Sequence, residues 1–242
     1  MPNYRIIIDI VEWINTNQGI VSLLIFFATI LLGWVSGIFS ALRRKPKFKI
    51  ELIPGPTFCC TFPTEKKHDH YDVHRTGVAL YLIVSNIGSA PSSIADISIG
   101  YHWNLKPFSK LWIKNTLGWF WLHEQTVILA DFQTSIGDTT KYYPFLIQRS
   151  NVSGENTQTF LDVGRSLNGV VYFEQNDSWG GCYPVVRDSK VLLKINVRDT
   201  FGNNHYAKFM VPAITLEEAK RFNPMFGKTW ETIHKDHCDG LL

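Results

Sequence analysis

The sequence lacks the motifs by which the common enzyme classes are recognised. It contains no GxSxG nucleophile elbow, no P-loop, no HExxH metal motif and no dinucleotide fingerprint. It also has no internal repeat and no low-complexity tract. Serine, histidine and aspartate are plentiful, but their spacing singles out no catalytic triad. We therefore predict no enzymatic activity, no catalytic residues and no cofactor.

Charged residues are scarce as well. Only 19% of the 242 residues are charged, and the net charge is +3. Soluble domains usually carry about a quarter. Most of the small positive excess lies in one cluster just after residue 42, so the composition predicts no nucleic-acid partner. The four cysteines show no paired CxxC spacing, and in a cytoplasmic domain we expect them to be reduced thiols.

The strongest feature present is a long stretch without charge. None of the thirty residues between Glu12 and Arg43 is charged, and the last part of this stretch is almost wholly apolar. About 20 apolar residues are enough to cross the core of a bilayer as one helix. We therefore predict a transmembrane helix over residues 19–42, preceded by a short interfacial segment over residues 1–18.

A cleaved signal peptide is the competing interpretation of this stretch. A signal peptide has a shorter apolar region, of about 7–15 residues, with basic residues in front of it. Here the apolar run is longer and the acidic residues Asp9 and Glu12 precede it, although Phe39-Ser40-Ala41 resembles a cleavage site. We favour the membrane anchor.

The flanking charges predict the orientation of this anchor. Five basic residues follow the apolar run: Arg43, Arg44, Lys45, Lys47 and Lys49. Lysine and arginine close to a membrane helix are retained on the cytoplasmic side. We therefore predict a single-pass protein with its N-terminus outside, a basic linker over residues 43–46 and a cytoplasmic C-terminal domain.

The rest of the chain shows the alternation of polar and apolar side chains that is typical of strands. The clearest segments are 47–53, 78–84, 95–103 and a hairpin of 191–197 with 205–211. Weaker ones are 126–130, 142–147, 159–163 and 169–175. These short strands predict a mainly β fold, with an antiparallel β-sandwich over residues 47–214. Their strand–Asn-x-Gly–strand rhythm resembles that of immunoglobulin-like domains.

A short helical tail is expected over residues 215–242. Thr215 to Glu218 matches a capping box at the start of a helix, and Asn223-Pro224 is expected to end that helix. A second short helix is expected over residues 229–238.

Small residues recur every four positions in the apolar run, at Gly33, Gly37 and Ala41. On one helix they would form a flat stripe that allows a second helix to approach closely. We therefore predict self-association, or contact with another membrane protein, through this stripe. Such contact could be coupled to recognition by the β-sandwich. Chance recurrence of small residues is the alternative.

The segment from Trp103 to Leu122 combines aromatic and basic side chains. Lys106, Lys110 and Lys114 lie four positions apart, and Trp112 lies between them. Lysines beside tryptophan suit a membrane interface. Three interpretations remain open: aromatic packing into the core, contact with the bilayer, and a surface for a protein partner.

A second candidate binding segment is the glycine-rich stretch from Gln175 to Pro184. Trp179 and Tyr183 stand there beside polar groups, and loops between strands often carry binding surfaces. An ordinary connection between two strands is the alternative.

Histidine clusters provide weak metal candidates. His68, His70 and His74 lie close together, and so do His234, His237 and Cys238. Neither cluster has a familiar ligand spacing, so we predict no metal site. The leading hypothesis is a membrane-anchored binding protein. The alternatives are a membrane-anchored metal-dependent hydrolase, using the first cluster, and a structural subunit of a membrane complex.

Overall fold

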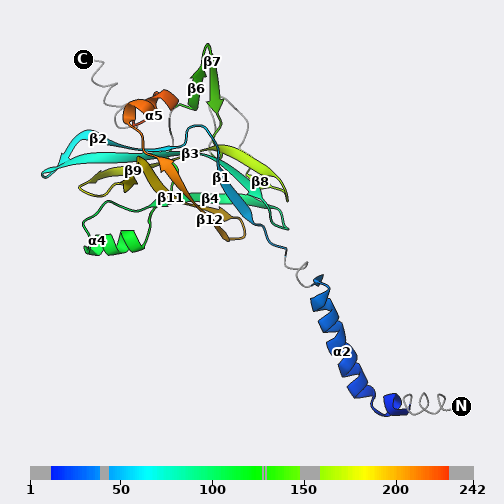
Figure 1. Ribbon diagram of the computed structural model, residues 1–242. Helices are drawn as coiled ribbons and strands as arrows, with labels where there is room; N and C mark the ends of the chain where they lie inside the picture. The colour runs from blue at the N-terminus through cyan, green and yellow to red at the C-terminus, as the bar shows by residue number, and fades with distance from the viewer. Residues whose placement is uncertain (1–11, 39–43, 127, 129, 148–158, 229–242) are drawn as a thin grey trace. The chain divides into compact units, whose positions relative to one another are not determined.

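A computed structural model describes residues 12–38, 44–126, 128, 130–147 and 159–228 of the chain. The chain divides into two compact units, Met1–Lys45 and Pro46–Leu242 (Figure 1). Several predictions fall outside the described residues: most of the interfacial segment, Ala41, and the second C-terminal helix with His234, His237 and Cys238.

The first unit contains helix α2, Gln18–Val35. Its 18 residues include no charged side chain, and at 1.5 Å per residue they extend about 27 Å. The helix is long and apolar enough to span a membrane, and a signal sequence would have the same character. The predicted apolar helix is therefore present, whereas its orientation stays a prediction.

Helix α2 ends earlier than the sequence suggested. Ser36 is its C-cap, and Gly37 has a φ of +74°, the left-handed conformation in which glycine commonly terminates helices. The prediction of one regular helix up to residue 42 was therefore wrong at this point. Gly33 lies within α2 but Gly37 lies beyond its end, so these two residues do not share a regular helical stripe. Association through them stays a prediction.

The second unit is built from antiparallel strands. One sheet contains β1 (Phe48–Leu52), β2 (Phe58–His68), β3 (Tyr71–Asn86) and β9 (Ser166–Trp179), and β3 is the central strand with which the other three pair. The other sheet contains β4 (Ser92–Tyr101), β5 (Phe120–Leu122), β8 (Phe160–Leu161), β10 (Val186–Arg187), β11 (Lys190–Asp199) and β12 (Asn204–Pro212). A separate hairpin joins β6 (Phe132–Ile136) to β7 (Thr139–Tyr143). The prediction of a mainly antiparallel β fold is confirmed, and its immunoglobulin-like character stays a prediction.

The two sheets form two layers (Figure 1) and share one apolar core. Alternating side chains of β3, such as Leu80 and Leu82, meet Ile97 and Ile99 of β4 in this core. Burying each such side chain stabilises the fold by about 1.5–3 kcal/mol. The predicted hairpin is also present, with Leu193 of β11 facing Phe209 of β12 in register.

A second apolar cluster covers the other face of the first sheet. Helix α5, Leu216–Phe222, packs there through Ala219, and Phe226 follows it into the same cluster. The predicted capping box is present, because the Thr215 hydroxyl accepts from the Glu218 N–H while the Glu218 carboxylate accepts from the Thr215 N–H. The helix ends at Asn223, as expected.

Some local predictions were wrong. No strand occupies the described residues of segment 126–130, and β7 ends at Tyr143 where a strand up to residue 147 was expected. Strand β9 continues to Trp179, so the predicted loop over 175–184 begins only at Gly180. The lysine-rich segment forms one turn of helix, α4 (Lys110–Trp112), which continues as a π-helix, η1 (Ile113–Leu117).

Candidate functional site

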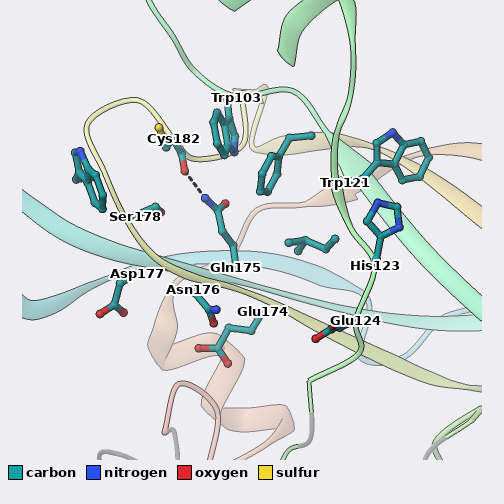
Figure 2. A pocket seen from close by; sticks show the side chains of 13 residues that line it. Trp103, Trp121, His123, Glu124, Glu174, Gln175, Asn176, Asp177, Ser178 and Cys182 are labelled. Carbon is teal, nitrogen blue, oxygen red and sulfur yellow. Dashed lines mark hydrogen bonds between the residues drawn. The ribbon is translucent and has the colours of Figure 1, made fainter. Parts of the chain in front are cut away.

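A pocket of about 560 Å³ opens between the edge strands of the two sheets. One wall comes from Trp103 and strand β5, and the other comes from the end of β9, residues 174–179. Residues 123–124 and Cys182 complete the lining (Figure 2). The pocket is open to solvent.

The alternation of β5 explains the aromatic wall. Phe120 lies opposite the buried Tyr101 of β4, so its side chain points between the sheets. Trp103, two residues after Tyr101, points to the same side, and its ring lies 4.1 Å from that of Phe120. After β5 the chain crosses to the other sheet, where the Thr126 N–H donates to the Tyr172 carbonyl at 3.0 Å. The crossing segment closes one end of the pocket.

The buried amide of Gln175 bridges two groups at the pocket. Its Oε1 accepts a hydrogen bond from the Tyr101 hydroxyl, and its Nε2 donates to the Cys182 carbonyl at 2.9 Å (Figure 2). Both ends of the amide are therefore engaged. Gln175 holds the chain after β9 in place rather than offering free groups to a ligand.

The chain after β9 is joined to the segment after β4 by main-chain hydrogen bonds. The Asn104 N–H donates to the Tyr183 carbonyl at 2.8 Å, and the Val185 N–H donates to the His102 carbonyl at 2.9 Å. A side chain at Gly181 would collide with the Asn104 carbonyl, so only glycine allows this close approach. The two connections therefore form one continuous wall.

The indole of Trp103 carries the most informative polar atom of the pocket. Its Nε1 is buried and has no hydrogen-bond partner within the described part of the chain. A buried donor without a partner costs about 1–3 kcal/mol and normally finds an acceptor. Trp103 lines the pocket, so an acceptor on a bound molecule could supply that partner if the side chains that cover Nε1 move aside.

Two acidic residues near the end of β9, Glu174 and Asp177, form ion pairs. Arg75 binds Glu174 and Asp177 together, and Lys66 adds a second contact to Asp177 at 2.9 Å. Burial raises the pKa of Glu174 above its usual value, although the Tyr172 hydroxyl and Arg75 bind its carboxylate and oppose that rise. For Asp177, burial also acts upwards, but the hydrogen bonds from Arg75 and Lys66 outweigh it, and the pKa is lowered. These carboxylates are held in place by cations.

The predicted binding residues of segment 175–184 have different roles. Trp179 lines the pocket and stacks on His68, with ring centroids 4.0 Å apart. Tyr183 does not line it; its hydroxyl instead accepts from Asn104 Nδ2 at 2.6 Å. Phe120 and Gln175 lie within the two candidate segments, but sequence reasoning did not single them out as pocket residues. Alternation marks Phe120 as inward-facing, but no local signal indicates what it faces.

The lysines and Trp112 of the segment from Trp103 to Leu122 do not line the pocket, although residues at both ends of this segment do. Phe108 has a φ of +65° and interrupts the path between Lys106 and the helical turn, so only Lys110 and Lys114 lie on α4 and η1. The Trp112 ring packs against the Phe108 ring in a tilted arrangement, with centroids 5.5 Å apart. This packing against a neighbour in its own loop differs from the core packing considered from sequence.

The histidine cluster is divided by a turn. His68 ends β2 and pairs with Tyr71 of β3, so His68, His70 and His74 do not share one strand. His74 Nε2 instead lies 3.4 Å from the Cys182 carbonyl. Among the residues that the structure describes, no group of three potential ligands could hold a metal ion.

The described thiols are poor candidates for nucleophiles. Burial raises the pKa of Cys59, and it raises the pKa of Cys60 to about 12. Burial also raises the pKa of Cys182 at the pocket. Since the thiolate is the reactive form, all three are expected to react slowly.

In comparisons with known proteins, no family model and no curated protein matches this chain.

Proposed function

We propose that the chain is a single-pass membrane protein whose cytoplasmic domain, an immunoglobulin-like sandwich, binds a partner through the pocket between β5 and β9. The recognised group would be an apolar or aromatic side chain next to a hydrogen-bond acceptor, such as a peptide carbonyl. Helix α2 would be the anchor, and the basic residues that follow it favour the cytoplasmic orientation.

The observation that carries this proposal is the buried, unpartnered Nε1 of Trp103 in an aromatic wall. Aromatic walls with a few directed polar groups are typical of ligand sites. The lining includes the carboxylates of Glu124, Glu174 and Asp177 and no lysine or arginine. This charge pattern favours a neutral group over an anion.

The position of the pocket supports recognition by an anchored domain. Strand β1 enters the domain where Phe48 pairs with Asn86, at the end of β3. The pocket residue Glu174 pairs with Gly77, nine residues back along β3, or about 30 Å. A partner could therefore occupy the pocket without meeting the point at which the chain enters the domain.

The proposal can be tested by photo-crosslinking in cells with the full-length protein. A photoreactive residue would replace Trp179 at the pocket, and the control would carry it at Ile87, an exposed residue near the end of β3. We expect a defined adduct from position 179 alone. Trp103→Phe keeps an aromatic ring, though a smaller one, but removes the donor, and should lower the adduct yield roughly tenfold. Equal yields at both positions, or no effect of Trp103→Phe, would contradict the proposal.

A further inference from the structure

The connection between β4 and β5 presents apolar side chains to solvent. We call residues 104–118 the finger. Phe108 is 86% exposed and Leu117 is 76% exposed, and Leu111 is exposed between them. Lys106, Lys110 and Lys114 belong to the same segment. Exposed apolar groups gathered among charged ones are a mark of interaction surfaces.

The backbone holds the finger in this arrangement. Phe108 adopts a left-handed conformation, which a bulky residue rarely does, and Ser109 caps the next turn by accepting from the Trp112 N–H at 3.0 Å. The turn continues as a π-helix, a form that occurs often at functional sites. His102 Nδ1 lies 3.1 Å from the Asn115 carbonyl and joins the finger to the end of β4. Exposure of Phe108 is therefore built into the fold.

The outer face of the neighbouring sheet has the same chemical character. Trp121, Gly100, Lys194 and Lys208 form one row across four strands. A side chain at position 100 would press against the Trp121 ring at about 3.1 Å, so the glycine allows that ring to lie over the sheet. The Lys194 ammonium lies 5.5 Å from the centre of the Trp121 ring and 4.4 Å from that of Tyr206. The row is both aromatic and basic.

Acidic residues are nearly absent from these segments. None occurs between Asp96 and Glu124, and β11, β12 and their turn contain only Asp199, which is buried. Exposed Leu192 and Met210 extend the apolar part of the face. In Figure 1, α4 lies on the side of the β4–β11–β12 layer, whereas α5 and the β6–β7 hairpin lie on the other side of the domain. The basic, aromatic and apolar groups thus belong to one side.

We propose that this side, the finger together with the outer face of β5, β11 and β12, docks on an anionic lipid surface. Lysines beside tryptophan and tyrosine suit the headgroup region, and Phe108 and Leu117 would enter the boundary of the acyl chains. The cytoplasmic leaflet is anionic. The inference rests on the proposed anchoring by α2. Residues 36–47 link α2 to β1 and span at most about 40 Å, so the same bilayer would be within reach.

The test uses the full-length protein reconstituted in vesicles with 30% phosphatidylglycerol and a quencher attached to the lipid chains. A fluorophore is placed by Phe108→Cys, with Ile136→Cys as the matched control, in a Cys182→Ser/Cys238→Ser background. Ile136 is 66% exposed and lies on the β6–β7 hairpin. Cys59 and Cys60 are buried and do not compete for the label.

We expect strong quenching at position 108 and little at position 136. Each lysine near an anionic surface strengthens binding roughly fivefold, so replacing Lys106, Lys110 and Lys114 by Gln should weaken docking roughly 100-fold. Vesicles of phosphatidylcholine alone should also reduce the quenching. Equal quenching at both positions, or quenching that ignores the lysines, would overturn the proposal.

The same experiment separates docking from anchoring. Protein that resists alkaline extraction but shows no quenching at position 108 would overturn docking and leave the anchor intact. Protein that is quenched at position 108 but is removed by alkali would support docking and refute the anchor. If an acidic protein, and not lipid, occupies this face, quenching at position 108 should stay at the level of position 136 in vesicles with and without phosphatidylglycerol.

Discussion

Asp199 joins the β11–β12 turn to the strand that enters the domain first. Its carboxylate is buried and accepts from the N–H groups of Phe201 and Asn203, both at 2.9 Å, and from His205 Nε2 at 3.0 Å. His205 Nδ1 in turn accepts from the Phe48 N–H at 3.2 Å. The imidazole is therefore neutral, with its proton on Nε2, and it connects the turn to the start of β1. Asp199→Asn tests this chain of hydrogen bonds while preserving shape.

The expected cost follows from counting donors. An asparagine at position 199 can still accept from the two backbone N–H groups through one oxygen, but its amide NH₂ then faces the Nε2–H of His205 and the Nδ2 donor of Asn203, which both donate to Oδ2 of Asp199 at 3.0 Å. Moving the imidazole proton to Nδ1 would relieve that clash and create another with the Phe48 N–H. At least one hydrogen bond must therefore be lost. A bond to a charged group contributes about 1.5–3 kcal/mol, and a buried donor is left unsatisfied, so we expect destabilisation by about 3 kcal/mol.

The assay is urea unfolding of the full-length protein in a mild detergent, followed by tryptophan fluorescence with linear extrapolation. Asp96→Asn, on the outer face of β4, is the matched control and should change the free energy of unfolding by less than about 0.5 kcal/mol. A cost below about 1 kcal/mol for Asp199→Asn would refute the proton assignment of His205.

The pH dependence provides an independent check. Burial acts to raise the pKa of Asp199, but hydrogen bonds from Asn203, His205 and Phe201 outweigh it, so the folded pKa is below its usual value. A lowered folded pKa gives stability that is complete above about pH 4 and is lost as the pH falls through the folded pKa. The difference in the free energy of unfolding between the natural protein and Asp199→Asn should therefore shrink on acidification below about pH 4. A difference that stays constant from pH 7 to pH 3 would contradict this account.

Three further predictions concern other parts of the chain. Thr215→Ala removes the capping box of α5 and should lower the free energy of unfolding by about 1 kcal/mol in the same urea assay. An unchanged free energy of unfolding would mean that water replaces the cap without penalty. Gly181→Ala should displace the wall of the pocket, because its Cβ meets the Asn104 carbonyl, and should therefore lower the yield of the photo-adduct formed from position 179. An unchanged yield would count against this. A cysteine at Ile136 should react with a membrane-impermeant maleimide only after cells are permeabilised, and labelling of intact cells would reverse the proposed orientation.

Strands that bury one face could be predicted because their side chains alternate. In β11, Leu193 and Ile195 face the core while Lys194 faces outward, and the sequence shows this contrast directly. Strand β2 was missed because its first three residues are buried on both faces while most of the remaining residues are polar and exposed, so polar and apolar side chains do not alternate along its whole length. Cys59 packs in the core between the sheets, whereas Phe58 and Cys60 pack in the cluster under α5. A segment buried on both faces, such as residues 58–60, has no polar positions to mark its period.

The pocket could be predicted only in fragments. Alternation from Tyr101 indicates that Trp103 points inward, but its neighbours depend on a crossing of the chain between the sheets at Thr126. Gln175 comes from a strand whose register with β3 contains an irregularity between His74 and Thr76. Local sequence does not encode which side chains such an irregularity brings together. The same is true of Lys194, whose aromatic neighbours come from two other strands.

The pocket and the proposed lipid-binding face share strand β5, and side-chain parity divides it between them. Phe120 packs inward against Trp103, and Trp119 points outward, where the Lys208 ammonium lies 5.4 Å from its ring. Trp121 contributes to both, because it lines the rim of the pocket and lies over Gly100. Substitutions at Trp119, which directly precedes β5, and at Phe120, its first residue, should therefore separate the two activities, with Trp119→Ser weakening lipid docking and Phe120→Leu weakening partner binding. Equal effects of both variants on both readouts would mean that the strand acts as one unit and that the two surfaces are coupled.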